Sequence, residues 1–249
     1  MFIDAGWGQD EQNMNRLRTA RYIPDVDPRE LAIYTPADAA SFLGIKQTTL
    51  ASWLHGRRYP KKSAPGIFFP LLKPADTEHR LLSFFNLAEA HVLAATRYEY
   101  QVSIGAVRRA LETLREKYPS EHPLISREFF TNGEDLFIKT VDENENLSRP
   151  GQLNLKPIMD KFLAHIGRDK NDIVDRIYPI IKGLPQDKTI GIIHGVASGQ
   201  PVLSGSGVPV WVIHGRHSAG ERKESIAKDF GITVSKVKRA IDYVEKRAA

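Results

Sequence analysis

Residues 35–56 read TPADAASFLGIKQTTLASWLHG, and the first half of this stretch predicts a short helix. Thr35 suits the N-cap, and Pro36 suits the first helical position, where a missing N–H costs nothing. Asp38 stands three residues after the cap and can reach back toward the Thr35 amide, as in a capping box. The residues that we expect on the buried face of this helix are Ala39, Ala40, Phe42 and Leu43.

Gly44 predicts the end of this helix, because glycine adopts a left-handed backbone conformation at little cost. Residues 46–55 predict a second helix, and Gly56 ends it in the same way. Two short helices joined by a three-residue turn that contains glycine are the outline of a helix-turn-helix. The sequence therefore predicts this motif in the first quarter of the chain.

The second helix has two different faces. At about 100° per residue, Leu50, Trp53 and Leu54 fall in one sector and should pack on the first helix. The opposite side and the start of the helix carry polar or basic residues that we expect to contact DNA, namely Lys46, Gln47, Thr48, Ser52 and His55. Hydroxyls reach base edges or phosphates in the major groove, and glutamine pairs bidentately with adenine. The alternative is a surface helix of an ordinary α-helical domain.

A basic stretch surrounds the end of this motif. Residues 39–75 contain six basic side chains and no acidic one. Four of the six flank a loop bounded by proline and glycine that leads into a strand-like apolar run; they are Arg57, Arg58, Lys61 and Lys62. This pattern is similar to the wing of a winged helix. Such a loop would lie along the phosphate backbone, where Arg and Lys fix register without reading sequence.

The composition is that of a folded chain. With 41% hydrophobic and 26% charged residues among 249, a packed core is feasible and wholesale disorder is not expected. No apolar run approaches the roughly 18–20 residues of a membrane span, and acidic residues near the start argue against a secretory signal. The absence of cysteine excludes disulfides, thiolate zinc sites and cysteine nucleophiles. We expect a soluble, cytoplasmic protein without membrane contact, whose net charge of +5 fits nucleic acid as a partner.

Two longer helices are expected after the basic stretch. The first covers residues 84–98 with Asn86 as its cap, and the second covers residues 103–118 with Ser103 as its cap. Residues 1–30 are polar and lack periodicity, so we expect an irregular arm there.

A hairpin is expected next, over residues 128–140. Asn132-Gly133 is the strongest short hairpin signal, and it predicts strands at 129–131 and 136–139. The acidic stretch 142–146 then begins a connection. An amphipathic helix over residues 155–166, ended by Gly167, follows the connection.

The last quarter of the chain repeats the helix–glycine–helix outline. Short strands are expected at 189–194 and 201–203, then a glycine-rich turn and the apolar run 208–213. Helices at 221–230 and 234–247 follow, separated by Gly231, and the second begins at Thr233 as its N-cap. The outer face of this second unit would show Ser235, Lys238 and Arg239, but also Asp242. Contact with DNA and contact with a protein partner both remain open for it.

The predicted fold class is mainly α with short β-hairpins. It comprises an N-terminal winged helix-turn-helix and a small C-terminal domain with a β-hairpin and a second helix-turn-helix. The expected boundaries are an arm at 1–30, the winged region at 31–150, a helical connector at 151–185 and the C-terminal domain at 186–249.

Specific motifs in this chain resemble a known family. The runs GQPVLSGSGVP (199–209) and IAKDFG (226–231) look like the small C-terminal domain of VapB-like antitoxins, although Gly207 stands where that family often has an arginine. Residues 33–56, with LSFFNLAEA (82–90) and VRRA (107–110), look like the MerR-type helix-turn-helix that precedes this domain in longer members. The resemblance covers residue 31 to the end of the chain.

The resemblance implies a type II toxin–antitoxin system. Its antitoxin represses its own operon by binding an operator and neutralises a PIN-like ribonuclease toxin. We expect a homodimer, because helix-turn-helix proteins usually read two half-sites. The alternatives are a stand-alone transcriptional regulator and a protein-interaction scaffold that does not bind DNA.

Catalytic patterns are weak in this sequence. There is no phosphate-binding loop of the Gly-x-x-x-x-Gly-Lys type, and the glycine-rich run 205–210 lacks the third glycine of a dinucleotide fingerprint. His214 and His217 have no third ligand at a suitable spacing. We therefore expect no enzymatic activity, no metal and no cofactor.

Overall fold

The structure, a computed structural model, describes residues 26–55, 57–59, 66–68, 70–98, 102–145 and 155–247. Within these residues the chain is mainly helical, with a two-stranded and a four-stranded antiparallel sheet. The elements are, in chain order, η1 (Pro28–Glu30), α2 (Pro36–Leu43), α3 (Gln47–His55), β1 (Arg57–Tyr59), β2 (Gly66–Phe68), α4 (Phe84–Tyr98), α5 (Ile104–Lys117), η2 (Phe129–Gly133), α6 (Glu134–Glu145), α7 (Lys156–Leu163), β3 (Ile166–Arg168), β4 (Val174–Ile177), β5 (Ile190–Ile193), η3 (Ala197–Gly199), β6 (Pro201–Leu203), α8 (Val210–Ser218), α9 (Lys223–Asp229) and α10 (Val234–Arg247).

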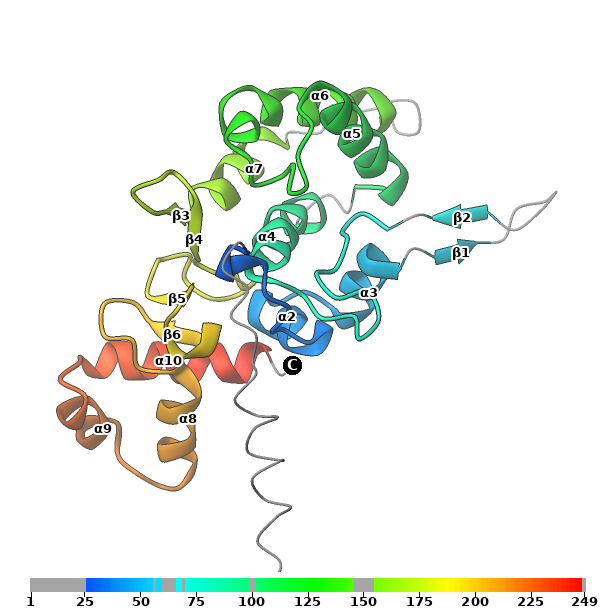
Figure 1. Ribbon diagram of the computed structural model, residues 1–249. Helices are drawn as coiled ribbons and strands as arrows, with labels where there is room; N and C mark the ends of the chain where they lie inside the picture. The colour runs from blue at the N-terminus through cyan, green and yellow to red at the C-terminus, as the bar shows by residue number, and fades with distance from the viewer. Residues whose placement is uncertain are drawn as a thin grey trace, which may run out of the picture.

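Figure 1 shows α4 near the centre of the molecule, with α5, α6 and α7 on one side and α8, α9 and α10 on the other. The four-stranded sheet connects these two sides, and its strands pair in sequence order. β4 pairs with β5 across the expected boundary between residues 185 and 186. The apolar side chains form two clusters: the first runs up to Ile180 and also includes Ile192 of β5, and the second contains Ile181, Ile190 and the apolar residues after them.

Several predicted helices are confirmed, and one cap is corrected. α4 has the expected bounds, but Ser83 and not Asn86 is its N-cap, because the Ser83 hydroxyl accepts the Asn86 N–H at 3.1 Å. Asn86 is instead the third residue of the helix, and its side-chain oxygen accepts a hydrogen bond from the Ser83 N–H. Ser103 caps α5 as expected, and Thr233 caps α10 by accepting the N–H of Lys236.

The hairpin expected at 128–140 is wrong. Residues 129–133 form the π-helical turn η2, which continues directly into α6. Phe129, Gly133, Phe137 and Val141 recur every four residues and are all buried, so this segment has the period of a helix that packs on α5. Gly133 allows close packing, because a Cβ there would lie 2.9 Å from the Leu114 Cδ1 of α5.

Two shorter segments also differ from expectation. Residues 142–145 belong to α6 and not to a connection. The helix expected up to residue 166 ends at Leu163, and Gly167 lies inside strand β3, where the Arg176 side chain covers it. In the apolar run 208–213, α8 begins at Val210.

The last helix packs directly on the first helix of the N-terminal motif. The Tyr243 hydroxyl of α10 donates to the Phe42 carbonyl of α2 at 2.5 Å, and Tyr243 is 1% exposed. The Arg247 guanidinium lies over the Phe42 ring, 5.4 Å from its centre. Carbonyls in the last turn of a helix have no partner within the helix, so this hydroxyl supplies one to α2.

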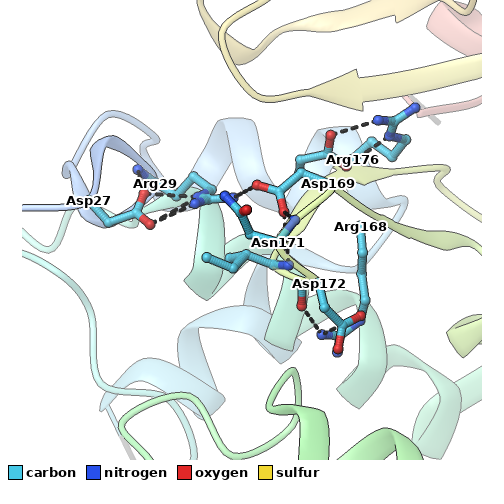
Figure 2. Close-up of polar contacts among 9 residues, drawn as sticks. Asp27, Arg29, Arg168, Asp169, Asn171, Asp172 and Arg176 are labelled. Atoms are coloured by element: carbon cyan, nitrogen blue, oxygen red, sulfur yellow. Dashed lines mark hydrogen bonds and ion pairs between the residues drawn. The ribbon is translucent and has the colours of Figure 1, made fainter.

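The segment that precedes the first motif is attached to the sheet. Figure 2 shows Arg29 of η1 between Asp27 and Asp169, and its Nη1 lies 2.8 Å from Asp169. Asp169 also accepts the N–H groups of Asn171 and Ile173, which shape the turn between β3 and β4. Residues 28–30, expected in an irregular arm, are therefore an ordered turn; residues 1–25 of that arm lie outside the described residues.

Candidate nucleic-acid interface

The first helix of the motif begins as expected, with one difference at its cap. The Thr35 hydroxyl accepts the Asp38 N–H at 3.1 Å, and Pro36 is the first helical residue. The Asp38 carboxylate accepts from the Thr35 hydroxyl at 2.6 Å and not from the Thr35 amide, so the expected capping box is replaced by a side-chain pair. The four apolar residues expected on the inner face are all buried.

The turn between α2 and α3 is fixed by Gly44. Its φ is +63°, and the Ile45 N–H after it donates to the Ala40 carbonyl at 2.9 Å. A side chain at position 44 would also overlap with Cδ1 of Ile181. Glycine is therefore required here for two reasons: a left-handed backbone and a close approach.

The inner side of α3 is buried in the main apolar cluster. Leu50, Trp53 and Leu54 are each 3% exposed or less, which confirms the inward face. The Trp53 carbonyl accepts two backbone N–H groups, from Leu71 at 2.7 Å and from Leu72 at 3.1 Å. Side chains on one face and these bonds at its C-terminal end hold α3 in place.

The outer side of α3 is open to solvent. Lys46, Gln47, Thr48 and His55 are exposed, and Ser52 is half-buried. The Ser52 hydroxyl donates to the Thr49 carbonyl at 2.7 Å, so it offers a ligand its lone pairs more readily than its proton. The structure thus brings together five of the expected DNA-contacting residues at the start and along the outer face of one helix.

A two-stranded hairpin follows α3 and extends away from it (Figure 1). β1 and β2 pair from Arg57 opposite Phe68 to Tyr59 opposite Gly66. This is the position expected for the basic loop. The backbones of Arg57 and Arg58 lie in β1, whereas their side chains, and all of Lys61 and Lys62, lie outside what the structure describes.

A groove opens beside the C-terminal end of α3. Its walls carry the cations Lys73, Arg80 and Arg115 together with His55. Partial burial and the charge of Arg80 lower the pKa of His55. The same groove is also lined by Asp27, Glu30 and Glu121, so its charge is mixed.

Sequence reasoning missed a charged cluster on the acidic side of the same groove. His122 lies between Glu89 of α4, at 2.9 Å from Nδ1, and Glu30 of η1, at 3.0 Å from Nε2. Burial alone would lower the pKa of His122, but hydrogen bonds and charge from Glu89 and Glu30 outweigh it and raise the pKa to about 9. The three residues come from distant parts of the sequence, so no local spacing could have indicated them.

The three residues expected on the outer face of the C-terminal helix-turn-helix differ in their exposure to solvent. Ser235 is exposed, and the Lys238 side chain is 63% exposed and pairs with Asp242 at 2.6 Å. The Arg239 side chain is only 11% exposed and donates to the Pro185 carbonyl. Arg239 therefore supports the fold and does not face outward as expected.

Two segments of the chain match family models. Residues 32–111 match a family described as "Putative DNA-binding HTH domain". Residues 190–244 match a family described as "Protein of unknown function (DUF433)". The first match contains the whole of α2 and α3, which supports assigning them as a helix-turn-helix.

Two relatives and one solved structure, all from Mycobacterium tuberculosis, are similar to nearly the whole chain. "Putative antitoxin VapB45" is 28% identical over 233 residues, which are 86% of this chain and 95% of the relative. "Uncharacterized protein Rv2308" is 27% identical over 88% of this chain and 91% of its own length. The crystal structure of Rv2018 superposes with a TM-score of 0.63 at 26% identity, covering 85% of this chain and 98% of that one.

Among the described residues, every helix is too short or too polar to cross a lipid bilayer. Those residues also contain no group of three or more His, Cys, Asp or Glu side chains placed to hold a metal ion. The Nδ1 of His217 is hydrogen-bonded to the Glu221 carbonyl oxygen at 3.1 Å.

Proposed function

We propose that this protein is a DNA-binding antitoxin that represses its own operon and neutralises a PIN-like ribonuclease toxin. The observation that carries the proposal is the outer face of α3, which presents Gln47 and Thr48 to solvent on a helix whose other face is fully buried. A recognition helix needs this combination, because it must enter the major groove without losing its place in the fold. The protein would act without enzymatic activity, as a cytoplasmic homodimer.

The hairpin β1–β2 supports a winged, MerR-like arrangement. It follows α3 directly and extends beyond it, so its basic loop would reach the phosphates beside the groove that α3 reads. Arg57, Arg58, Lys61 and Lys62 would then supply affinity, and α3 would supply sequence preference.

The toxin-binding half of the proposal rests on similarity. The resemblance of residues 31 onward to VapB-like antitoxins agrees with the relative that is described as an antitoxin and matches 86% of this chain. A toxin of the PIN-like class is the partner that this family implies.

The test compares Gln47→Ala with Thr131→Ala, an exposed polar position on η2 far along the chain. Binding is measured by fluorescence anisotropy on the intergenic DNA before the gene and on random-sequence duplex. A bidentate contact is worth about 1–3 kcal/mol of discrimination, so Gln47→Ala should lower the preference for the intergenic DNA about 5- to 150-fold. Thr131→Ala should leave the preference unchanged.

Two results would contradict the proposal. An unchanged preference in Gln47→Ala would remove α3 as the reading helix. Absence of any salt-dependent binding by the wild-type protein would favour an interaction scaffold instead. Co-expression with the neighbouring toxin gene tests the second half, since growth should be restored only when this chain is present.

A further inference from the structure

The C-terminal unit repeats the backbone of the first helix-turn-helix. In the first turn the Gly44 N–H donates to Ser41 at 3.2 Å, and the Ile45 N–H donates to Ala40 at 2.9 Å. In the second turn the Gly231 N–H donates to Lys228 at 3.2 Å, and the Ile232 N–H donates to Ala227 at 2.9 Å. The φ angles of the two glycines are +63° and +61°. The two turns therefore have the same conformation.

The helices after these turns are also buried in the same pattern. Leu50, Trp53 and Leu54 of α3 correspond in position to Val237, Ala240 and Ile241 of α10, and all six are 3% exposed or less. α8 packs on α10 and contributes Val210 and Ile213 to the same apolar cluster. The unit α8–α9–α10 is therefore a three-helix domain that contains a second helix-turn-helix, and all but its last three residues lie in the segment matched by a family of unknown function.

The outer positions of this unit differ from those of the first motif, because Gln47, Thr48 and His55 are matched by Val234, Ser235 and Asp242, and its exposed cations Arg222 and Lys238 stand at other positions. Ser235 stands where Thr48 stands in the first motif, and Arg222 stands where Thr35 stands, at the start of the preceding helix. The Arg222 and Lys238 side chains are 83% and 63% exposed. Their ion pairs with Glu224 and Asp242 lie at the surface, where such pairs are weak and exchange easily for a phosphate.

Base reading is not supported at this second unit. Arg239, at the position equivalent to Ser52, is turned inward onto Pro185, and Asp242 would repel a base edge that accepts hydrogen bonds. What remains exposed suits phosphates, which need only positive charge and donors. Lysine and arginine bound to phosphates add affinity and fix register, without adding sequence preference.

We propose that α9 and the first half of α10 form a second contact with the phosphate backbone of duplex DNA. This inference rests on the proposed DNA-binding function of the first motif, because α10 packs on α2 through Tyr243 and is placed by it. One chain would then contact the duplex at two points: α3 in the groove and the second unit on the backbone.

The test uses the full-length variant Arg222→Ala/Lys238→Ala and the control Lys139→Ala. Lys139 is a close match for Lys238: it is 74% exposed and faces Glu143 four residues later, as Lys238 faces Asp242. The salt dependence of binding is measured on the intergenic DNA and on random-sequence duplex of about 30 base pairs, which holds two half-sites. Each lost phosphate contact removes about 0.9 from the slope of log affinity against log salt.

The double variant should lower the slope by about 1.8 on both DNAs and leave the preference between them unchanged. A slope equal to that of Lys139→Ala would overturn the inference. If Gln47→Ala still reduced the preference in that case, the proposed function would stand and only the second contact would be rejected. Absence of duplex binding by the wild type would reject both. Urea unfolding midpoints equal to wild type show that the surface changes leave the fold intact.

Discussion

Gly44 and Gly231 have the same backbone conformation in different surroundings, which allows one prediction to be made with its own control. Both have φ near +60°, where an L-residue pays roughly 1–2 kcal/mol. A side chain at position 231 would meet nothing within 4 Å, whereas at position 44 it would overlap with the Ile181 Cδ1. Only Gly44→Ala therefore adds an overpacking cost.

The magnitudes follow from these two contributions. Gly231→Ala should lower the free energy of unfolding by about 1–2 kcal/mol, from the backbone alone. Gly44→Ala adds about 1–3 kcal/mol for displacing a buried side chain, for a loss of about 2–5 kcal/mol. The lower end is expected, because only the terminal methyl of Ile181 has to move.

A double-mutant cycle isolates the contact. Ile181→Val removes Cδ1 and should itself cost about 0.5–1.5 kcal/mol, yet it should recover most of the overpacking cost when combined with Gly44→Ala. The same valine should not rescue Gly231→Ala. Urea unfolding followed by circular dichroism measures all five variants. Equal losses at the two glycines, or additive behaviour of Gly44→Ala with Ile181→Val, would refute the reasoning.

The other predictions concern pH, the contact between the ends of the chain, and α6. His91 is fully buried, and burial lowers its pKa to about 4, so the free energy of unfolding should fall as pH drops from 6.5 toward 4. In His91→Gln this decrease should be smaller by up to about 3 kcal/mol, measured by urea unfolding at a series of pH values. The pKa of His122 is raised to about 9, so its stabilising charge is fully present below pH 6.5 and is lost as pH rises through 9. In His122→Asn the free energy of unfolding should therefore depend less on pH between 6.5 and 9. The same pH dependence as in the wild type would show that the ion cluster around His122 does not stabilise the fold. Tyr243→Phe should lower the free energy of unfolding by about 1–3 kcal/mol by removing the bond to Phe42, with Tyr118→Phe as the control and thermal melting as the readout; equal melting temperatures would contradict it. Gly133→Ala should cost about 1–3 kcal/mol by pressing on Leu114, and a neutral result would argue against the close packing of α6 on α5.

Short-range signals predicted the motif well. Thr35, Pro36 and Gly44 specify where α2 begins and ends through bonds that span at most five residues, so the sequence alone contains the information. The same holds for Ser103 and Thr233, whose caps are local. The exposed residues of α3 follow from its period once its ends are known.

Competing local signals explain the main error. Asn132-Gly133 favours a hairpin turn in isolation, but Phe129, Phe137 and Val141 have helical spacing and can bury their side chains against α5 only as a helix. The burial of these side chains outweighs the turn preference of two residues. Gly133 is present because α5 lies close, and that reason becomes visible only in three dimensions.

Other features depend on residues that are distant in sequence. Arg29 with Asp169, and His122 with Glu30 and Glu89, meet only after the chain has folded. Periodicity predicted that Arg239 faces outward, yet the segment at Pro185 lies against that side of α10, and the Pro185 carbonyl accepts from the Arg239 guanidinium. No pattern within a helix reports what a neighbouring loop will cover.

The bond between Tyr243 and Phe42 joins residues that are 201 positions apart. At about 5–20 residues per second, a ribosome needs roughly 10–40 s to make the intervening chain. Throughout that interval the nascent protein already contains α3, but α2, which precedes it, still lacks its contact with α10. Full assembly of the motif therefore waits for the synthesis of α10, and fragments that stop short of this helix lack the contact.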